Sequence, residues 1–203
     1  MPSLPAQDPP AAYACMKRPV LHAGTLSVRA VQKAEIEAIR HWRNAQMNVL
    51  RQAEPISPEQ QEAYFAHHIW PQYALARPDT ILLSYREGDA LIGYGGLVHI
   101  AWEHCRAEIS FLLDPMHTKD EAAYARYFSD FLRLMKRLAF ADLGLNRLFT
   151  ETYATRPHHI AVLESAGLRR EGVMRAHVII GGQPVDSILH GCLSSDGGWS
   201  DEA

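Results

Sequence analysis

The side chains that most often bind metal ions or act as nucleophiles and bases are the eleven histidines and three cysteines. Adjacent histidines occur at His67-His68 and His158-His159, and neighbouring residues on a helix point in different directions. No HExxH or comparable ligand set is present, so the sequence predicts no metal site. Cys105 directly follows His104, but neighbours on a strand face opposite ways, so this pair cannot act as nucleophile and base. Cysteines without metal-type spacing fit a reducing compartment.

The segment Trp42-Arg43-Asn44 has the residue types needed to bind a small polar molecule. A Trp ring can stack on a sugar or base, while Arg and Asn can hold hydroxyl or phosphate oxygens. Trp42 is also in phase with Ile39 on a predicted helix, so core packing is an open alternative for it. Arg43 and Asn44 could likewise simply end that helix.

The predicted strands are the first group of elements that could position such residues. Seven short segments combine β-prone residues with apolar alternation: Leu26–Val31, Thr80–Arg86, Leu91–Ala101, Cys105–Leu113, Arg147–Tyr153, Val178–Ile180 and Val185–Leu193. The polar turn Glu87-Gly88-Asp89 joins the second and third of them. Gly181-Gly182 permits the positive dihedrals of a hairpin turn between the last two.

Helical periodicity and end signals mark four further segments: Ala34–Trp42, Ser57–Ile69, Tyr124–Leu138 and Pro157–Ala166. In the second, Ser57 is expected at the cap, Pro58 in the first turn, and Gln60 three residues after the cap. Gly144 stands where a left-handed residue would close the third helix.

Size and composition indicate one globular domain. The 203 residues are 47% hydrophobic and 21% charged, enough for a full core. We predict a domain over residues 25–194, an extended or mobile segment over 1–24, which holds five prolines, and a loose polar tail over 195–203. The formal charge of -3, the lack of a long apolar run and the lack of a secretory signal predict a cytoplasmic protein without nucleic-acid or membrane partners.

The order of these elements resembles a known family. LGLNRL, then a strand, a Pro-started helix and ESAGLRREGVMR, whose end up to Arg175 is expected to form a returning strand, resemble the C-terminal half of the GNAT acyltransferase superfamily. The match is nearest to the branch of ribosomal-protein and nucleotide-sugar N-acetyltransferases and covers about residues 26–193. It implies an α/β (α+β) fold of order β-αα-βββ-α-β-α-ββ, with a mixed, mostly antiparallel central sheet and helices on both faces. It also implies acetyl-CoA as co-substrate and acetyl transfer to an amine.

The resemblance implies where acetyl-CoA binds. In the family, the strand matching 105–113 splays from the strand matching 147–153, and the pantetheine arm lies in the gap. Backbone groups of Phe111, Leu112 and Leu113 are therefore expected to hydrogen-bond that arm. A backbone N–H there would also stabilise the oxyanion that forms when the amine attacks the thioester.

The loop that matches the family's pyrophosphate-binding loop departs from the family pattern. The family loop carries glycines, and the pyrophosphate rests on the N-terminus of the following helix. Here the loop is Met116–Glu121, without glycine, and Asp120 would repel phosphates or simply cap the helix. Lys119 and Arg126 are the residues expected to hold the phosphates instead; weak or lost CoA binding is the alternative.

A second departure lies in the helix that begins at Pro157. Many relatives have Asn before this helix and, within it, a Tyr that protonates the departing thiolate. The matching residues here are Arg156 and Leu163, and leucine cannot donate a proton. Arg156 is expected to contact CoA phosphates or to be a surface charge.

An attacking amine must be neutral, so the implied reaction needs a general base. Glu108 is the first candidate, because its strand lies close to the expected thioester. The alternative is a strand carboxylate paired with Arg106 or Arg147. His99, near the end of the preceding strand, is the second candidate, although a simple hydrogen-bonding role is open for it.

The acceptor is expected beside the first helix. Trp42-Arg43-Asn44 followed by Glu54-Pro55-Ile56-Ser57 resembles the first-helix signature of nucleotide-sugar N-acetyltransferases. This favours an amino sugar, free or nucleotide-linked, as the small-molecule amine acceptor. A protein N-terminus is the alternative acceptor, favoured by an acidic or open groove; convergent basic groups would favour a sugar phosphate. The alternative class of function is a GNAT-fold protein that binds a partner without catalysing acetyl transfer. A homodimer of this chain is consistent with the sequence.

Overall fold

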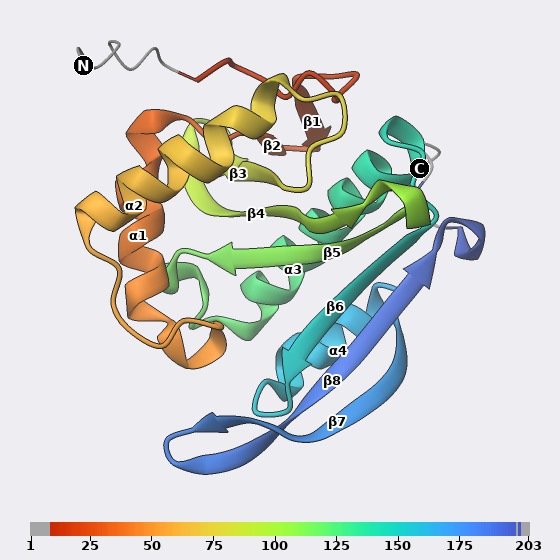
Figure 1. Ribbon diagram of the computed structural model, residues 1–203. Coiled ribbons are helices and arrows are strands. Elements are labelled where there is room, and N and C mark those ends of the chain that lie inside the picture. Colours follow the sequence, from red (N-terminus) through yellow and green to blue (C-terminus); the bar gives the residue numbers. More distant parts are fainter. Residues whose placement is uncertain (1–8, 198, 200–203) are drawn as a thin grey trace.

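The computed structural model describes residues 9–197 and 199, and one twisted sheet runs through them (Figure 1). Its strands are β1 (Val20–Ala23), β2 (Leu26–Ala30), β3 (Ile81–Glu87), β4 (Ala90–Ala101), β5 (Arg106–Leu113), β6 (Arg147–Tyr153), β7 (Arg169–Ile180) and β8 (Gln183–Leu193). They lie in the order β1-β2-β3-β4-β5-β6-β8-β7. Every neighbouring pair is antiparallel except β5 and β6, which are parallel.

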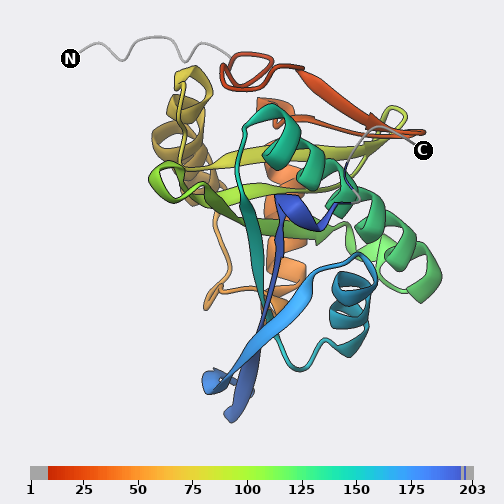
Figure 2. The ribbon, with the colours of Figure 1, turned by 90° about the vertical axis from the view of Figure 1, so that its right-hand side faces the viewer.

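Helices cover both faces of the sheet, which is the predicted fold class. They are α1 (Ile36–Ala45), α2 (Pro58–Tyr64), α3 (Glu121–Lys136) and α4 (Pro157–Ser165). In Figure 2, α3 lies in front of the sheet and α1 behind it. On the α3 side, the Tyr85 hydroxyl donates to the Tyr127 carbonyl at 2.8 Å. On the α1 side, Arg43 donates to the Tyr94 hydroxyl, also at 2.8 Å.

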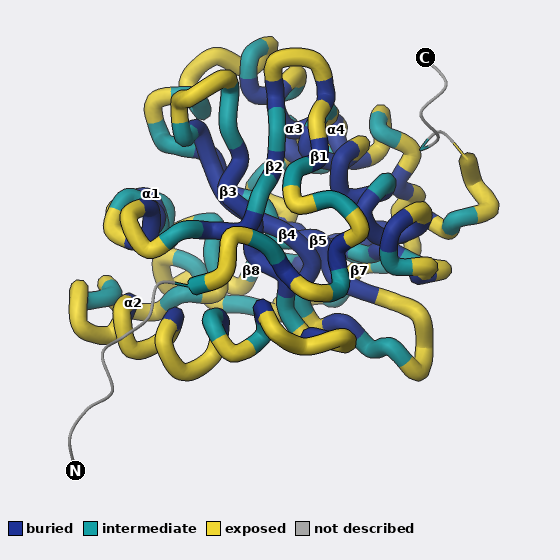
Figure 3. The backbone as a smooth tube through the Cα atoms, turned by 90° about the horizontal axis from the view of Figure 1, so that it is seen from above, coloured by how far each residue is buried: buried dark blue, intermediate teal, exposed yellow. Residues whose placement is uncertain are grey.

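The core follows the central strands. Buried residues concentrate along the middle of the sheet, while exposed ones follow the loops and outer turns (Figure 3). On the α3 side, the Phe111 ring stacks on Phe128 with centroids 4.5 Å apart, and Phe131 packs against both Phe111 and Tyr85. These aromatic rings fix α3 against β3 and β5.

The structure confirms two local predictions, the bounds of one strand and the start of one helix. β6 has the predicted bounds, and α2 begins with the predicted capping box. The Gln60 N–H donates to Ser57 Oγ at 3.2 Å, and the Ser57 N–H donates to Gln60 Oε1 at 2.8 Å. The helix predicted to reach Ile69 changes after Tyr64 into a π-helical turn, Phe65–Ile69.

The predicted extended or mobile segment is wrong over residues 9–24. Val20–Ala23 pairs with β2 as an edge strand, and Tyr13 is only 1% exposed. The Tyr13 hydroxyl accepts from the Leu82 N–H at 2.8 Å. Four residues directly after Pro19 give too weak a local signal for a strand; pairing and side-chain burial decide it. Residues 1–8 and most of the predicted polar tail lie outside the described residues; within that tail, the Trp199 indole donates to the Ser194 carbonyl at 2.8 Å.

The strand predicted at Val178–Ile180 is longer in the structure. β7 starts at Arg169 and forms an arm with β8 that extends beyond the body of the sheet (Figure 1). Its register shifts twice, and Ala176 has a positive φ of 49° while its N–H donates to Asp186 Oδ1. The returning strand expected up to Arg175 and the segment Val178–Ile180 are therefore one strand, and much of this arm is exposed.

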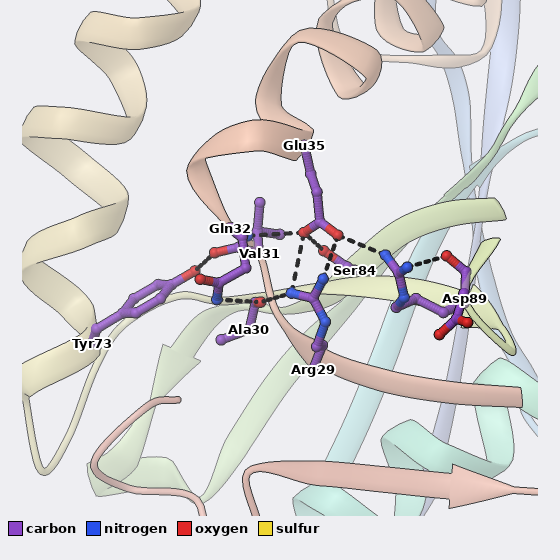
Figure 4. A network of polar contacts seen from close by, with 9 residues as sticks. Arg29, Ala30, Val31, Gln32, Glu35, Tyr73, Ser84 and Asp89 are labelled. Carbon is purple, nitrogen blue, oxygen red and sulfur yellow. Dashed lines mark hydrogen bonds and ion pairs between the residues drawn. The ribbon is translucent and has the colours of Figure 1, made fainter. Parts of the chain in front are cut away.

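A buried carboxylate fixes the start of α1 on the sheet (Figure 4). Glu35 is 7% exposed and lies directly before the helix. It accepts from Arg29 of β2 at 2.7 Å and from Arg86 of β3 at 2.8 Å, and the hydroxyl of Ser84 also donates to it. Two guanidinium groups and a hydroxyl therefore hold this helix end in place, which in turn orients Arg43 near its other end.

Candidate active site

The parallel strands β5 and β6 pair over three positions only, from Arg106↔Arg147 to Glu108↔Phe149. Beyond these positions the strands diverge (Figure 1), as the resemblance to the family implied. A cavity of about 190 Å³ opens in this split, bounded by β5, β6, the start of α4 and the loop before α2. We call it the cleft.

Beyond the N–H of Ile109, which the last β5–β6 pairing position uses, backbone groups of β5 face the cleft without a partner on β6. The Asp114 N–H donates to the Ile92 carbonyl on β4 at 2.9 Å. Hydrogen-bonded and non-hydrogen-bonded positions alternate along an antiparallel pair, so every second residue back along β5 also bonds to β4. The residues between them, whose N–H and C=O groups face β6, are Ile109, Phe111 and Leu113.

This alternation separates the three residues expected to hold pantetheine into two groups. Phe111 and Leu113 direct their backbone groups toward the cleft side, but Leu112 directs its own toward β4. The Leu113 carbonyl already accepts from the Gln46 amide at 2.8 Å. The N–H groups on this edge and the Phe111 carbonyl fit an extended amide chain such as pantetheine.

Glu108 lies at the closed end of the cleft, on the α1 side of the sheet. The residue is 8% exposed, and its Oε1 accepts from Arg51 at 2.8 Å. Its Oε2 lies 3.7 Å from His99 Nε2, so the two predicted base candidates are neighbours. The His99 side chain is 68% exposed and occupies a bulge of β4 with φ of 49°.

The ion-pair partners expected for Glu108 were wrong. Arg106 lies over the Phe149 ring, 5.6 Å from its centroid, and Arg147 pairs with Glu171. The actual partner, Arg51, comes from the loop between α1 and α2. No local pattern marks it, since the contact joins residues 57 positions apart.

Arg51 also bridges the two diverging strands. Its Nη2 donates to Glu108 on β5 and to Glu151 on β6, each at 2.8 Å. Burial opposes the charged form of Arg51, but the two carboxylates outweigh it and raise the pKa of the guanidinium. Glu108 therefore faces a permanent positive charge on one side and an exposed imidazole on the other.

A second cavity, of about 440 Å³, lies on the α1 and α2 side. We call it the acceptor pocket. Glu54, Gln60, Tyr64 and Tyr94 contribute polar groups to its wall. It shares three lining residues with the cleft: Arg43, Val98 and Ser110.

The residues predicted to bind the acceptor take different positions. Arg43 and Glu54 line the acceptor pocket, and Arg43 is held by Tyr94 and by Gln52. Trp42 is packed in the core, the alternative considered for it. Asn44 fixes the following loop, because its amide donates to the Ile56 carbonyl and its Oδ1 accepts from the Ile56 N–H.

The α4 side of the cleft holds a polar chain. Arg156 donates to the Tyr124 hydroxyl at 3.2 Å, and that hydroxyl lies 2.7 Å from His159 Nδ1. Burial, followed by the Arg156 charge, holds the pKa of His159 well below its usual range, so the ring is neutral. Burial also lowers the pKa of Arg156, against the opposing effect of Tyr124. Arg156 is thus a cleft residue rather than a free surface charge.

The start of α3 is capped by its own side chain. Asp120 Oδ1 accepts from the N–H groups of Ala122 and Ala123 at 2.9 and 3.0 Å. Lys119 is exposed nearby, whereas Arg126 pairs with Glu87 and lies over the Tyr127 ring. The structure does not bring Arg126 to the cleft. The N–H groups of Ala122 and Ala123 at the start of α3 are thus already occupied by a carboxylate.

Leu163 is fully buried in α4 and has no donor to offer the cleft. Other lining residues that the sequence did not single out are Arg51, Ser110, Thr150, Glu151 and Tyr153. Alternation within β6 was visible, but not which of its residues would lie beyond the last paired position. Within residues 9–197 and 199, no group of three His, Cys, Asp or Glu side chains could hold a metal ion.

A split parallel pair, a carboxylate at its closed end and an adjoining pocket define an acyltransferase-type site on a mixed sheet. Residues 28–189 match the family model described as acetyltransferase (GNAT) domain. The chain therefore belongs to the GNAT acetyltransferase family, and residues 28–189 form its acetyltransferase domain.

The chain is also similar to individual acetyltransferases. The uncharacterized N-acetyltransferase YoaA of Bacillus subtilis is 27% identical over 108 residues, covering 53% of this chain and 58% of the relative. The chain thus matches little more than half the length of that relative. Spermidine N-acetyltransferase from Vibrio cholerae, solved with CoA and spermine, has a TM-score of 0.74 at 20% identity, covering 85% of this chain and 98% of that one. A dodecameric structure of the Vibrio enzyme has a TM-score of 0.71 at 18% identity, covering 86% and 96%. Likeness at this identity shows the fold.

Among the described residues, no helix is long and apolar enough to cross a membrane.

Proposed function

We propose that this protein transfers an acetyl group from acetyl-CoA to the primary amine of a small molecule. The observation that carries the proposal is the junction of two cavities. The cleft and the acceptor pocket meet at Arg43, Val98 and Ser110, and Ser110 follows the candidate base Glu108 by two residues on the same face of β5. An amine in the pocket can therefore reach a thioester in the cleft.

The residues at this junction supply the proton chemistry. Glu108 takes the amine proton, directly or through one water, as the amine attacks. His99, 3.7 Å away and largely exposed, then passes the proton to solvent. Unpaired N–H groups of β5 stabilise the negative charge on the carbonyl oxygen. For the co-substrate, Ile109, Phe111 and Leu113 offer backbone groups and Arg156 a charge, while Lys119 stays the proposed phosphate contact.

The lining of the acceptor pocket favours an amine without a phosphate group. Arg43 is its basic residue among those described, and it is already held by Tyr94 and Gln52. Convergent basic groups, which a nucleotide sugar needs, are not gathered there. Hydroxyls, amides and Glu54 suit a free amino sugar or a short polyamine. Spermine in the related Vibrio structure supports including polyamines.

An acceptor screen tests this proposal. Purified protein is incubated with acetyl-CoA and equimolar amino sugars, nucleotide-linked amino sugars, polyamines or peptides with free N-termini, and free thiol is measured. We expect turnover with an amino sugar or polyamine. Turnover confined to peptides would establish the protein N-terminus as acceptor. Turnover confined to nucleotide-linked sugars would show that the pocket was misread, although it would support the predicted nucleotide-sugar branch.

Calorimetry separates catalysis from the alternative of a binding module. Micromolar affinity for acetyl-CoA, weakened in dephospho-CoA, is expected if Lys119 and Arg156 contribute to phosphate binding. No binding at millimolar acetyl-CoA would contradict the proposed activity. The homodimer and the cytoplasmic location stay predictions; light scattering of the purified protein tests the first.

A further inference from the structure

The two faces of the sheet carry different chemistry at the split. Glu108 and Glu151, bridged by Arg51, lie on the α1 side. Thr150 lies on the other face, because side chains alternate along β6 and its register partner His190 contacts Glu164 of α4. A thioester that enters the split between the strands is therefore flanked by a base on one face and by Thr150 on the other.

Thr150 carries an unused buried hydroxyl. The residue is 4% exposed and lines the cleft, and its Oγ1 has no hydrogen-bond partner. It lies one residue beyond Phe149, the last position of β6 that pairs with β5. A buried hydroxyl without a partner is costly, and Thr150 carries one at the closed end of the cleft, where a bound ligand would be its neighbour.

The residue across the strand pair does not satisfy this hydroxyl. His190 is opposite Thr150 in the register of β6 and β8, and its Nδ1 is also buried without a partner. His190 Nε2 lies 3.3 Å from Glu164 Oε1. No hydrogen bond joins Thr150 to His190, so the donor capacity of this buried hydroxyl is unused.

We propose that the Thr150 hydroxyl donates a hydrogen bond to the sulfur of CoA as it leaves, and so supplies the stabilisation that Leu163 cannot. This role rests on the proposed acetyl transfer. The amine nitrogen bonds to the carbonyl carbon on the α1 side, and its surplus proton goes to Glu108. The carbon–sulfur bond breaks, and the sulfur departs with the bonding electrons as a thiolate on the opposite side. Thr150 stabilises this anion until water protonates it.

The test measures the thiol of CoA bound to the protein, through the ultraviolet absorbance of the thiolate as pH is raised. In the unaltered protein we expect the pKa of the bound thiol to lie below that of free CoA, since a hydrogen bond to the charged form favours it. In Thr150→Val the pKa of that thiol should rise by about one to two units, and kcat should fall about 10- to 100-fold. Thr150→Ser, which keeps a hydroxyl, should behave like the unaltered protein.

A matched control separates this role from a structural one. Ser187 on β8 carries another buried hydroxyl without a partner, outside the cleft. Both Thr150→Val and Ser187→Ala remove such a group, so the melting temperature of either should stay equal or rise. Ser187→Ala should leave the pKa of the bound thiol and the ratio of CoA to desulfo-CoA affinity unchanged. Thr150→Val should lower that ratio.

The outcomes distinguish this inference from the proposed function. If CoA binds with a lowered thiol pKa and Thr150→Val leaves it unchanged, the role of Thr150 is wrong while acetyl transfer stands. If the thiol pKa equals that of free CoA, thiolate stabilisation by the protein is excluded. If CoA does not bind at all, the proposed function fails, and the role of Thr150 fails with it.

Discussion

At the scale of single residues, the site depends on which charges each carboxylate meets. Glu108 contacts Arg51 and approaches His99, so it is held in place and connected to solvent at once. The sequence singled out both Glu108 and His99, because a carboxylate and an imidazole stand out on apolar strands. Arg51 and Thr150 could not be recognised in this way: their roles arise from the split in the sheet, which places them against residues far away in the chain.

Glu108→Gln tests the base directly. The amide keeps the shape of the side chain but cannot take the amine proton, so kcat should fall about 100-fold or more. Affinity for CoA, measured by calorimetry, should stay nearly unchanged, because the contacts proposed for the co-substrate are backbone groups further along β5. Unaltered turnover would remove Glu108 from the role of base.

His159 should make stability depend on pH. Its folded-state pKa is held well below the usual value, mainly by burial, whereas in the unfolded chain it is near 6.5. As pH falls below about 6.5, the unfolded chain binds a proton that the folded protein does not, so the free energy of unfolding decreases by up to about 1.4 kcal/mol per pH unit. His159→Phe, which keeps a ring against Phe128, should flatten this slope between pH 6.5 and 5 in urea titrations. The slope should be nearer to that of the unaltered protein in His158→Phe, where the ring is partly exposed; equal slopes for all three proteins would contradict this account.

At the scale of elements, the sequence predicted what local signals control. The Ser57–Gln60 capping box and the β6 segment formed as predicted. β1 was missed because sheet pairing and the burial of Tyr13, rather than propensity, determine it. β7 was predicted in two parts, a returning strand up to Arg175 and Val178–Ile180, because both of its faces are largely exposed, which weakens the alternation on which strand prediction depends.

The anchor of α1 gives a stability prediction. Glu35→Ala leaves Arg29 and Arg86 without their shared carboxylate, and breaking a buried pair of this kind costs about 3–5 kcal/mol. Chemical denaturation should show this loss, together with weaker acceptor binding, because Arg43 lies on the same helix. Glu37→Ala, which removes an exposed pair on α1, should change the free energy of unfolding far less. Similar losses in both variants would contradict the anchoring role of Glu35.

At the scale of the whole molecule, the sheet is interrupted at the cleft, which is the place proposed to bind acetyl-CoA. Acetyl-CoA that binds only the folded protein raises the free energy of unfolding by about 2.7 kcal/mol at 100 times its Kd. Thermal unfolding should therefore shift upward with acetyl-CoA, and further than with acetate or free adenosine diphosphate. A melting temperature that does not respond to saturating acetyl-CoA would contradict binding in the cleft.

The three-position pairing of β5 with β6 has one further consequence. Strands β1 to β5 and strands β6 to β8 form two hydrogen-bonded blocks, and only these few rungs connect them within the sheet. Such a seam allows the smaller block to open in fluctuations that leave the larger one intact. Amide hydrogens of β6 and β8 should therefore exchange with deuterium faster than those of β3 and β4. A pantetheine chain lying against β5 adds the missing rungs, so the co-substrate would turn two cooperative units into one.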